Sequence, residues 1–358
     1  MRIGLVCPYS LTIPGGVQGQ VLGLARSLRG LGHEVRVLGP CDGPPPDSGV
    51  TPLGHSVPTA ANGSVAPLAP DPSAQLRTIR ALRDEGFDVV HLHEPIAPGP
   101  TMTALLFANA PLVGTFHAAG ESAAYKYLGW GLRRMARRLA HRCAVSPDAE
   151  RLARGALGGT YELLFNGIEV ERFAVGEAHP TDGPTIFFLG RHEPRKGLDV
   201  LLAALSDLPD DVHVWVGGDG PQSGELRERY GHDARIEWLG RISDDERAAR
   251  MRGCTVYCSP SVRGESFGMV LLEAMAAGCA LVASDLDGHR NVATDGVDAL
   301  LAPVGDAAAL AKSLRRVLDD ASLRSDLVAG GRKRAEELSM GRLAQRYVEI
   351  YTAVVAAG

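Results

Sequence analysis

Short apolar runs alternate along the chain with segments in which apolar residues recur every three or four positions. The first half contains five such runs: Ile3–Cys7, Glu34–Leu38, Asp88–Leu92, Leu112–Phe116 and Cys143–Val145. After the first run, a helical stripe follows through Val17, Val21, Leu24, Ala25 and Leu28. Short runs of this kind, joined by amphipathic helices, are typical of buried parallel strands. The pattern predicts a doubly wound α/β domain.

A second series follows Asn166-Gly167. Its predicted strands are Thr185–Leu189, Val212–Val216, Ile236–Leu239, Thr255–Ser259 and Ala280–Ala283, and its predicted helices are Leu198–Leu205, Asp244–Met251, Met269–Ala277 and Ala307–Leu318. The polar stretch Glu169–Pro184 is the expected linker. We therefore predict two Rossmann-like domains, at residues 1–168 and 169–340, and a terminal amphipathic helix at 341–358. The Pro/Gly-rich stretch Pro40–Pro72 is expected to be loop, with one strand near Pro52–Pro58.

Length and composition agree with this division. The 358 residues exceed one ordinary core, and 45% are hydrophobic and 22% charged. The net charge of −5 argues against general nucleic-acid binding. A strand is predicted from Ile3 with no signal segment before it, and no apolar run reaches the roughly 18–20 residues of a membrane helix, so we expect a cytoplasmic protein. The six scattered cysteines are expected to be buried free thiols.

The most specific pattern is a pair of glutamates eight positions apart around a Phe-Gly break. If a helix begins at Phe267-Gly268, Glu265 lies in the loop before it and Glu273 about two turns inside. The first backbone N–H groups of such a helix form an anion site. An anion site flanked by carboxylates suits a ligand with a central phosphate and hydroxyls at both ends, such as a nucleotide sugar. The alternative is an amphipathic helix with one solvated glutamate.

Two further segments have the composition of phosphate-binding loops. Gly15 and Gly16 follow the first predicted strand, where glycine lets backbone approach a phosphate. The G-x-G-x-x-G spacing of dinucleotide sites is absent, and a plain turn is the alternative. Later, Arg191, Arg195 and Lys196 bring three cations to one loop. A cation about 4 Å from a developing negative oxygen contributes roughly 4 kcal/mol at an effective dielectric near 20, although a surface cluster is possible.

Histidines end two of the predicted strands. His117 follows Leu112–Phe116 directly, and a lone histidine there is either structural or catalytic. His91 and His93 fall on one face of their strand and Glu94 on the other. No further ligand follows them, so a metal site is disfavoured.

Residues 122–142 contain six Lys/Arg residues and no acidic residue. One predicted helical face carries Leu128, Leu132, Met135 and Leu139, and the opposite face carries Arg133, Arg134, Arg137 and Arg138. This amphipathic basic helix is either a solvated face or a weak docking surface for anionic lipid.

These motifs resemble those of the retaining GT-B glycosyltransferases, and over its whole length the chain is similar to the actinobacterial phosphatidylinositol mannosyltransferases. The resemblance rests on Pro14–Gln18, Phe87–Pro95, Glu193–Gly197 and Gly264–Asp287. It implies two domains facing a central cleft, an acceptor-binding first domain on which the terminal helix packs, and a donor-binding second domain. It also implies a metal-independent hexosyltransferase that moves mannose from GDP-mannose to the inositol of a membrane lipid, with retention.

The resemblance further implies roles for individual residues. The reacting site would be formed by His117, Arg191, Lys196 and Glu265. The nucleotide and diphosphate would contact Gly16, Phe267, Gly268, Met269, Val270 and Glu273, and the acceptor inositol would contact Tyr9 and Asn62. The implied partners are a nucleotide sugar, a lipid or inositol acceptor, and the inner face of the plasma membrane, bound weakly. No nucleic acid is implied.

Two departures from the family pattern leave the acceptor open. The family has a Lys/Arg-dense helix after Asn-Gly-Ser, where this chain has Ala66–Pro72. The loop after His117 continues Ala118–Glu121, and Glu121 would repel a phosphate. A different nucleotide sugar with a soluble acceptor is one alternative. A GT-B sugar-nucleotide epimerase and a non-catalytic nucleotide-sugar binding protein are alternatives of another class.

Overall fold

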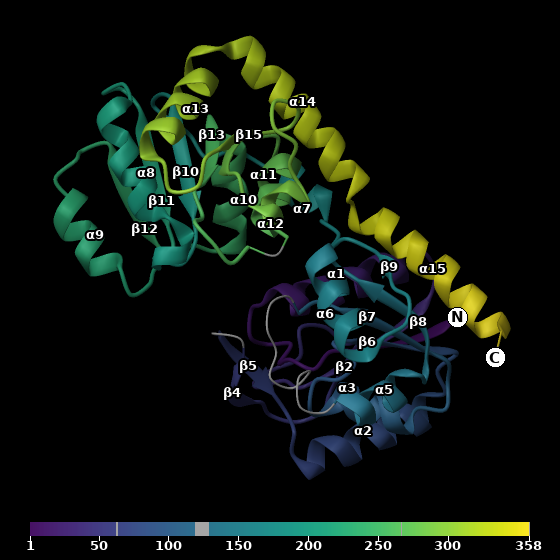
Figure 1. Ribbon diagram of the computed structural model, residues 1–358. Helices are drawn as coiled ribbons and strands as arrows, with labels where there is room; N and C mark the ends of the chain where they lie inside the picture. The colour runs from purple at the N-terminus through teal and green to yellow at the C-terminus, as the bar shows by residue number, and fades with distance from the viewer. Residues whose placement is uncertain (62–63, 119–128, 266, 358) are drawn as a thin grey trace. The chain divides into compact units, whose positions relative to one another are not determined.

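The computed structural model describes residues 1–61, 64–118, 129–265 and 267–357, which form two compact units (Figure 1). Met1–Gly167 together with Met340–Gly358 make the first unit, and Ile168–Ser339 make the second. Each unit contains one large parallel sheet covered by helices. The predicted α/β class with two parallel sheets is therefore confirmed.

The first unit contains a seven-stranded parallel sheet in the order β3-β2-β1-β6-β7-β8-β9. Its strands are β1 (Arg2–Val6), β2 (Glu34–Gly39), β3 (Val50–Pro52), β6 (Val89–His93), β7 (Leu112–Phe116), β8 (Leu139–Ala144) and β9 (Glu162–Leu163). A separate antiparallel pair is formed by β4 (Val57–Ala61) and β5 (Ser64–Leu68). The helices are α1 (Gly16–Gly30), α2 (Pro72–Glu85), α3 (Pro100–Phe107), α5 (Gly129–Ala136), α6 (Pro147–Leu157) and α15 (Met340–Ala357).

The second unit contains a six-stranded parallel sheet in the order β12-β11-β10-β13-β14-β15. Its strands are β10 (Thr185–Leu189), β11 (His213–Gly217), β12 (Ile236–Gly240), β13 (Val256–Ser259), β14 (Ala280–Ser284) and β15 (Leu300–Ala302). Its helices are α7 (Val170–Ala174), η1 (Pro194–Lys196), α8 (Leu198–Ala204), η2 (Leu205–Asp207), α9 (Ser223–Tyr230), α10 (Asp244–Gly253), α11 (Met269–Ala277), α12 (Asp287–Arg290), α13 (Ala307–Asp319) and α14 (Ala321–Glu337). All six cysteines of the chain are buried and free, as expected.

Both sheets reverse their strand order once, and this reversal fixes where the loops of interest lie. In the first unit the reversal falls between the neighbours β1 and β6, and in the second between β10 and β13. The loops after two such strands diverge at the carboxyl edge, where open α/β sheets bind their ligands. A ligand-binding site is therefore expected in the segments that follow β1, β6, β10 and β13.

Two segments that were expected to be loop or linker contain regular structure. Pro40–Pro72 contains β3, β4 and β5, although it was expected to be loop with one strand. Its prolines conceal the pattern, and prolines are tolerated in strands that lie at an edge or in an isolated pair. The expected linker Glu169–Pro184 contains α7.

The predicted basic helix over 122–142 is wrong in its carboxyl part, and residues 122–128 lie outside the described residues. Helix α5 ends at Ala136, and Leu139 begins β8. Arg133 donates to the carbonyl of Ala156 at 2.8 Å, and Arg138 donates to the carbonyl of Leu105 at 2.7 Å. These two arginines satisfy carbonyls at the carboxyl ends of α6 and α3, so they do not form one free cationic face.

The terminal helix α15 belongs to the first unit although it follows the second in sequence, and Figure 1 shows it along the side of that unit. It packs against α1, and its tyrosines reach the central strands. Tyr351 Oη lies 2.6 Å from His91 Nδ1, and Tyr347 Oη lies 2.8 Å from Thr115 Oγ1. His91 Nε2 is 2.7 Å from the same Thr115 hydroxyl. This buried network joins α15 to β6 and β7.

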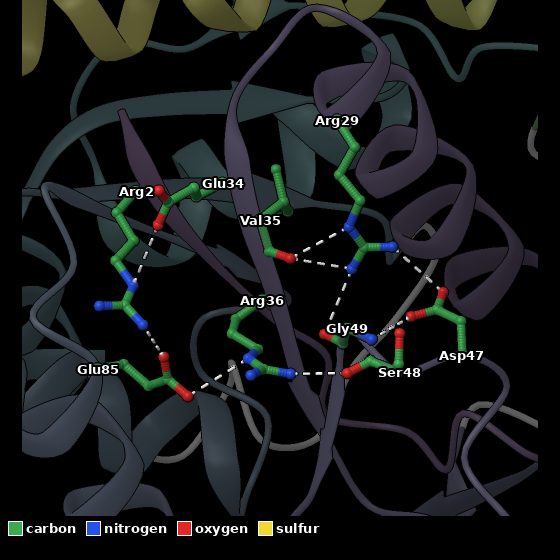
Figure 2. Close-up of polar contacts among 9 residues, drawn as sticks. All are labelled: Arg2, Arg29, Glu34, Val35, Arg36, Asp47, Ser48, Gly49 and Glu85. Carbon is green, nitrogen blue, oxygen red and sulfur yellow. Dashed lines mark hydrogen bonds and ion pairs between the residues drawn. The ribbon is translucent and has the colours of Figure 1, made fainter.

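Arginines close the amino-terminal edge of the same sheet (Figure 2). Arg29, in the last turn of α1, donates to the carbonyl of Val35 at 2.9 and 3.1 Å and to Asp47 at 3.2 Å. Pairing of β2 with β3 begins only at Val37, so Arg29 binds a carbonyl that β3 does not reach. Arg36 forms an ion pair with Glu85 at 3.3 Å. This cluster is structural and lies at the edge of the sheet opposite the loops that follow β1 and β6.

Candidate active site

An ion pair between two distant segments marks the site in the second unit. Lys196 Nζ lies 2.5 Å from Glu265 Oε1, and the side chains are 21% and 12% exposed. The hydroxyl of Ser261 donates to the same carboxylate oxygen at 2.9 Å. Burial alone raises the pKa of Glu265, but Lys196 and Ser261 outweigh it, so the pKa lies below its usual value. Glu265 is therefore an ionised acceptor at neutral pH.

The fold brings this pair together because β10 and β13 are adjacent and parallel. The loops that follow them bond through their backbones: the N–H of Val262 donates to the carbonyl of Arg195 at 2.8 Å. Gly197 has a φ of 66°, and a Cβ there would lie 2.0 Å from the carbonyl oxygen of Pro260. Only glycine permits this approach.

The other cations of the loop are held by a residue that the sequence did not single out. Glu193 forms ion pairs with Arg195 at 2.6 Å and with Arg191 at 3.9 Å. Arg195 also comes within 4.0 Å of Glu265. The Arg191 side chain is 68% exposed and has no ion pair with Glu265 among the described residues. Of the predicted cations, Lys196 therefore lies at the carboxylate and Arg191 at the rim.

Helix α11 begins beside this cluster at Met269, the first residue of the predicted helix Met269–Ala277 and two residues after Phe267. Gly268 is the N-cap in the left-handed conformation, with a φ of 76°. The helix start formed by Gly268, Met269 and Val270 has the positive end of the helix dipole. Phe267 is buried, 3% exposed. The segment thus combines an anion-favouring helix start with a carboxylate in the loop before it.

Glu273 lies slightly more than one turn inside α11, not two turns, because the helix begins at Met269 and not at Phe267. Its carboxylate is 3.3 Å from Nη1 of Arg247, a residue of α10 that sequence reasoning missed. Burial raises the pKa of Glu273, and the charge of Arg247 opposes that rise. Glu273 is therefore the second carboxylate of the site. It lies on α11 and pairs with Arg247, whereas Glu265 lies in the preceding loop and pairs with Lys196.

In the first unit, His117 follows β7 and lies beside β6. Its Nε2 is 3.0 Å from Nδ1 of His93, and the rings are stacked with centroids 5.2 Å apart. Burial lowers the pKa of His117 to about 4, so both rings are neutral at pH 7 and one donates an N–H to the other. A neutral imidazole can bond a sugar hydroxyl and has no charge of its own.

The remaining predicted residues of this unit lie at the loop after β1. Gly16 is the first residue of α1, and a Cβ there would meet open space. Tyr9 is partly buried and forms a bridge to Leu68 of β5. Burial raises the pKa of its hydroxyl, so Tyr9 is a neutral donor or acceptor. Asn62, the other predicted acceptor contact, lies outside the described residues.

The described residues contain no group of three or more His, Cys, Asp or Glu side chains placed to hold a metal ion. His91 and His93 instead bond to Thr115 and His117. No described helix is long and apolar enough to span a bilayer.

Comparison with known proteins defines the class first. The family model "Glycosyl transferases group 1" matches residues 169–334, and "Glycosyltransferase Family 4" matches residues 14–172. The fold is similar to that of Anabaena Alr3699/HepE, solved in complex with UDP and glucose, with a TM-score of 0.74 at 18% identity, covering 99% of this chain and 100% of that chain. The chain is a glycosyltransferase of the GT-B fold.

Curated relatives narrow this class. The chain is 42% identical to the phosphatidyl-myo-inositol mannosyltransferase of Mycolicibacterium smegmatis, covering 100% of this chain and 95% of the relative. It is 41% identical to the Mycobacterium leprae enzyme of the same name, covering 100% and 98%. The chain belongs to the phosphatidyl-myo-inositol mannosyltransferase family. The resemblance inferred from the motifs is confirmed, while the roles of single residues stay predictions.

Proposed function

We propose that this protein transfers a mannosyl group from GDP-mannose to the inositol ring of phosphatidylinositol, with retention of configuration. The observation that carries the proposal is the Lys196–Glu265 pair beside the start of α11. It combines a cation, a carboxylate and a helix dipole within one loop cluster at the strand reversal of the sheet. The family membership supports the choice of donor and acceptor.

The second unit would hold the donor. Lys196 and Arg191 would neutralise the leaving diphosphate, and the N–H groups at the start of α11 would bind its oxygens. Glu265, ionised and buried, would accept hydrogen bonds from sugar hydroxyls. Glu273 would accept those of the ribose diol. The role of Glu265 follows from its lowered pKa, which keeps the carboxylate ionised at neutral pH.

The first unit would hold the acceptor. His117 would contact the transferred sugar through a neutral ring, and Tyr9 would contact an inositol hydroxyl. Gly16, where the backbone is open, would lie against the donor diphosphate.

The test is incubation of the protein with GDP-mannose and phosphatidylinositol vesicles, followed by mass spectrometry of the lipids. We expect a lipid heavier by one hexose, with an α-linkage by NMR. Free inositol phosphate and UDP-glucose serve as competing acceptor and donor, and EDTA should leave the rate unchanged. Product on free inositol phosphate alone would support a soluble acceptor. Epimerised or unchanged GDP-mannose would overturn the proposal.

Membrane contact is proposed for the face formed by α3 and α5, which pack together in the first unit (Figure 1). Leu106 and Phe107 at the end of α3 are 45% and 56% exposed. Arg134 lies on α5 and Arg137 follows its last residue. Neither arginine has an ion pair within the described part of the chain. Each cation contributes roughly 1 kcal/mol near an anionic surface. Two cations with two exposed apolar side chains suit weak, reversible attachment.

A further inference from the structure

Glu94 has features that the proposed function leaves unused. It follows β6 at the strand reversal of the first unit and is 4% exposed. Its φ of 52° makes it the one residue other than glycine with a positive φ among those the structure describes. A glutamate in the left-handed region is strained, and such strain persists where the surrounding structure holds it, commonly at functional sites.

The strained backbone directs the carboxylate toward the end of the neighbouring strand β7. Glu94 Oε1 accepts hydrogen bonds from the backbone N–H groups of His117 and Ala118. The backbone of Glu94 is tied to β7 as well, because its N–H donates to the carbonyl of Thr115 at 2.8 Å. One residue therefore satisfies the first two N–H groups after β7, where the ladder with β6 has ended.

His117 is consequently fixed at both ends. Its peptide is held by Glu94, and its ring is held by His93 at 3.0 Å. The peptide sets the direction in which the His117 side chain leaves the backbone. If the peptide turned, we therefore expect the ring to lose its contact with His93. The direction of the His117 ring therefore depends on the Glu94 carboxylate.

Glu94 also acts on Tyr9, on the loop after β1. The hydroxyl of Tyr9 is buried, and the nearby charge of Glu94 adds to the rise of its pKa. Burial raises the pKa of Glu94 itself to about 7, although the two N–H donors oppose this rise. A carboxylate of this kind is expensive to bury. It lies between His117 and Tyr9, the two described residues assigned to the sugar and the acceptor.

We propose that Glu94 is a positioning residue for the acceptor: by holding the peptide N–H groups of His117 and Ala118, it aims His117 at the transferred sugar. This inference rests on the proposed function, because the roles of His117 and Tyr9 come from it. A purely structural role is the competing explanation.

Two substitutions separate the roles. Glu94→Gln keeps an oxygen that can accept both N–H bonds, whereas Glu94→Ala removes it. We expect Glu94→Ala to lower kcat about 10- to 100-fold, the effect of a misplaced contact, and to raise KM for phosphatidylinositol several-fold. Glu94→Gln should stay within about threefold of wild type in both. GDP affinity should not change in either variant, because the hydrogen bonds of the Glu94 carboxylate reach only His117 and Ala118, and neither residue is assigned to GDP.

Glu162→Ala is the matched control, because Glu162 is a partly buried glutamate of the same unit. Glu162 forms ion pairs with Arg346 at 2.7 Å and with His141 at 3.0 Å and contacts no proposed acceptor residue. Glu162→Ala should lose thermal stability and keep the wild-type KM for the acceptor. Expressing kcat per GDP-binding molecule removes the effect of unfolded protein. The proposal is overturned if Glu94→Ala behaves like Glu162→Ala, or if Glu94→Gln is as damaged as Glu94→Ala.

A readout without turnover keeps the two proposals separable. In ¹⁵N-histidine spectra, the fixed ring of His117 should give distinct Nδ1 and Nε2 resonances in wild type and in Glu94→Gln. We expect these resonances to shift toward an averaged position in Glu94→Ala. Spectra that are identical in all three proteins contradict the positioning role. A wild-type protein that makes no glycolipid but shows this pattern would refute only the proposed function.

Discussion

Lys196 Nζ lies 2.5 Å from Glu265 Oε1, although 69 positions separate the two residues along the chain. Each is the other's main charge partner in a largely buried place, so loss of one leaves the other charge uncompensated. A nucleotide sugar would insert its phosphate on one side of this pair and its hydroxyls on the other. Because the two side chains are still 21% and 12% exposed, solvent can reach the charge that remains, and we expect variants of the pair to affect the reaction more than the fold.

Lys196→Ala and Glu265→Ala should each lower kcat about 10²–10³-fold with the fold intact, because each removes charge stabilisation equal to roughly 3–4 kcal/mol. Steady-state kinetics with GDP-mannose, together with circular dichroism, measure this. Lys312→Ala is the matched control, since Lys312 is an exposed residue of α13 in the same unit. Wild-type rates in either site variant would end the assignment.

Glu273→Gln should weaken GDP binding about tenfold or more, since a charged acceptor of a diol contributes roughly 1.5–3 kcal/mol. Burial raises the pKa of Glu273, so the carboxylate becomes protonated at a higher pH than an ordinary glutamate. GDP affinity of the wild type should consequently fall on acidification, and this fall should be smaller in Glu273→Gln. Calorimetric titrations across pH 5 to 8 would show it, and equal GDP affinities in the two proteins would contradict the role.

Arg134→Glu with Arg137→Glu should reduce binding to vesicles that contain phosphatidylglycerol and leave binding to neutral phosphatidylcholine vesicles unchanged. The reason is that both arginines are exposed and have no ion pair in the described residues, and that α5, which carries Arg134, packs against α3, which carries the exposed Leu106 and Phe107. Arg315→Glu with Arg316→Glu on α13 is the control of equal charge in the other unit. Co-sedimentation measures partition. If both double variants partition alike, α5 is only a solvated face.

Stability should fall on acidification before most carboxylates titrate. Burial lowers the pKa of His91 to about 3, whereas an unfolded histidine titrates near 6.5. Below about pH 6.5 the unfolded chain binds a proton that the folded chain does not, so this part of the stability is present above pH 6.5 and is lost progressively toward pH 3. The slope is at most about 1.4 kcal/mol per pH unit for one histidine.

His91→Asn should reduce that slope between pH 6.5 and 5, as measured by the thermal midpoint at each pH. His55→Asn is the control, because the side chain of His55 is 85% exposed. Parallel pH curves for wild type and His91→Asn would show that the buried network with Tyr351 and Thr115 does not set the acid limit.

The central strands and the site helix were predictable because local and tertiary preferences agree there. Leu112–Phe116, Thr185–Leu189 and Met269–Ala277 have the predicted bounds, since each is an apolar run between polar or glycine-containing residues. Residues 122–142 were not predictable in the same way. The apolar spacing continues from α5 into β8, and only the contacts of Arg133 and Arg138 with other helices show that the helix has ended.

The motifs around Glu265 indicated a donor site, but partners that belong to other segments were hidden. Arg247 meets Glu273 from another helix, and Glu193 holds two arginines that look alike in the sequence. Glu94 was placed on a strand face, where it would point away from the histidines. Its left-handed φ turns it toward His117, and no sequence pattern signals a positive φ at a glutamate.

The chain leaves the first unit at Gly167 and re-enters it at Met340, and these two points adjoin, since a Cβ on Gly167 would lie 2.9 Å from the Cα of Met340. Residues 168–339 are thus inserted into the first unit, and the chain leaves and re-enters that unit at two neighbouring positions. Such an insert can be exchanged, as one cassette, for the corresponding segment of a relative without severing the host domain. Under the proposed assignment of the donor to the second unit and the acceptor to the first, such an exchange would change the donor site and leave the acceptor site as it is.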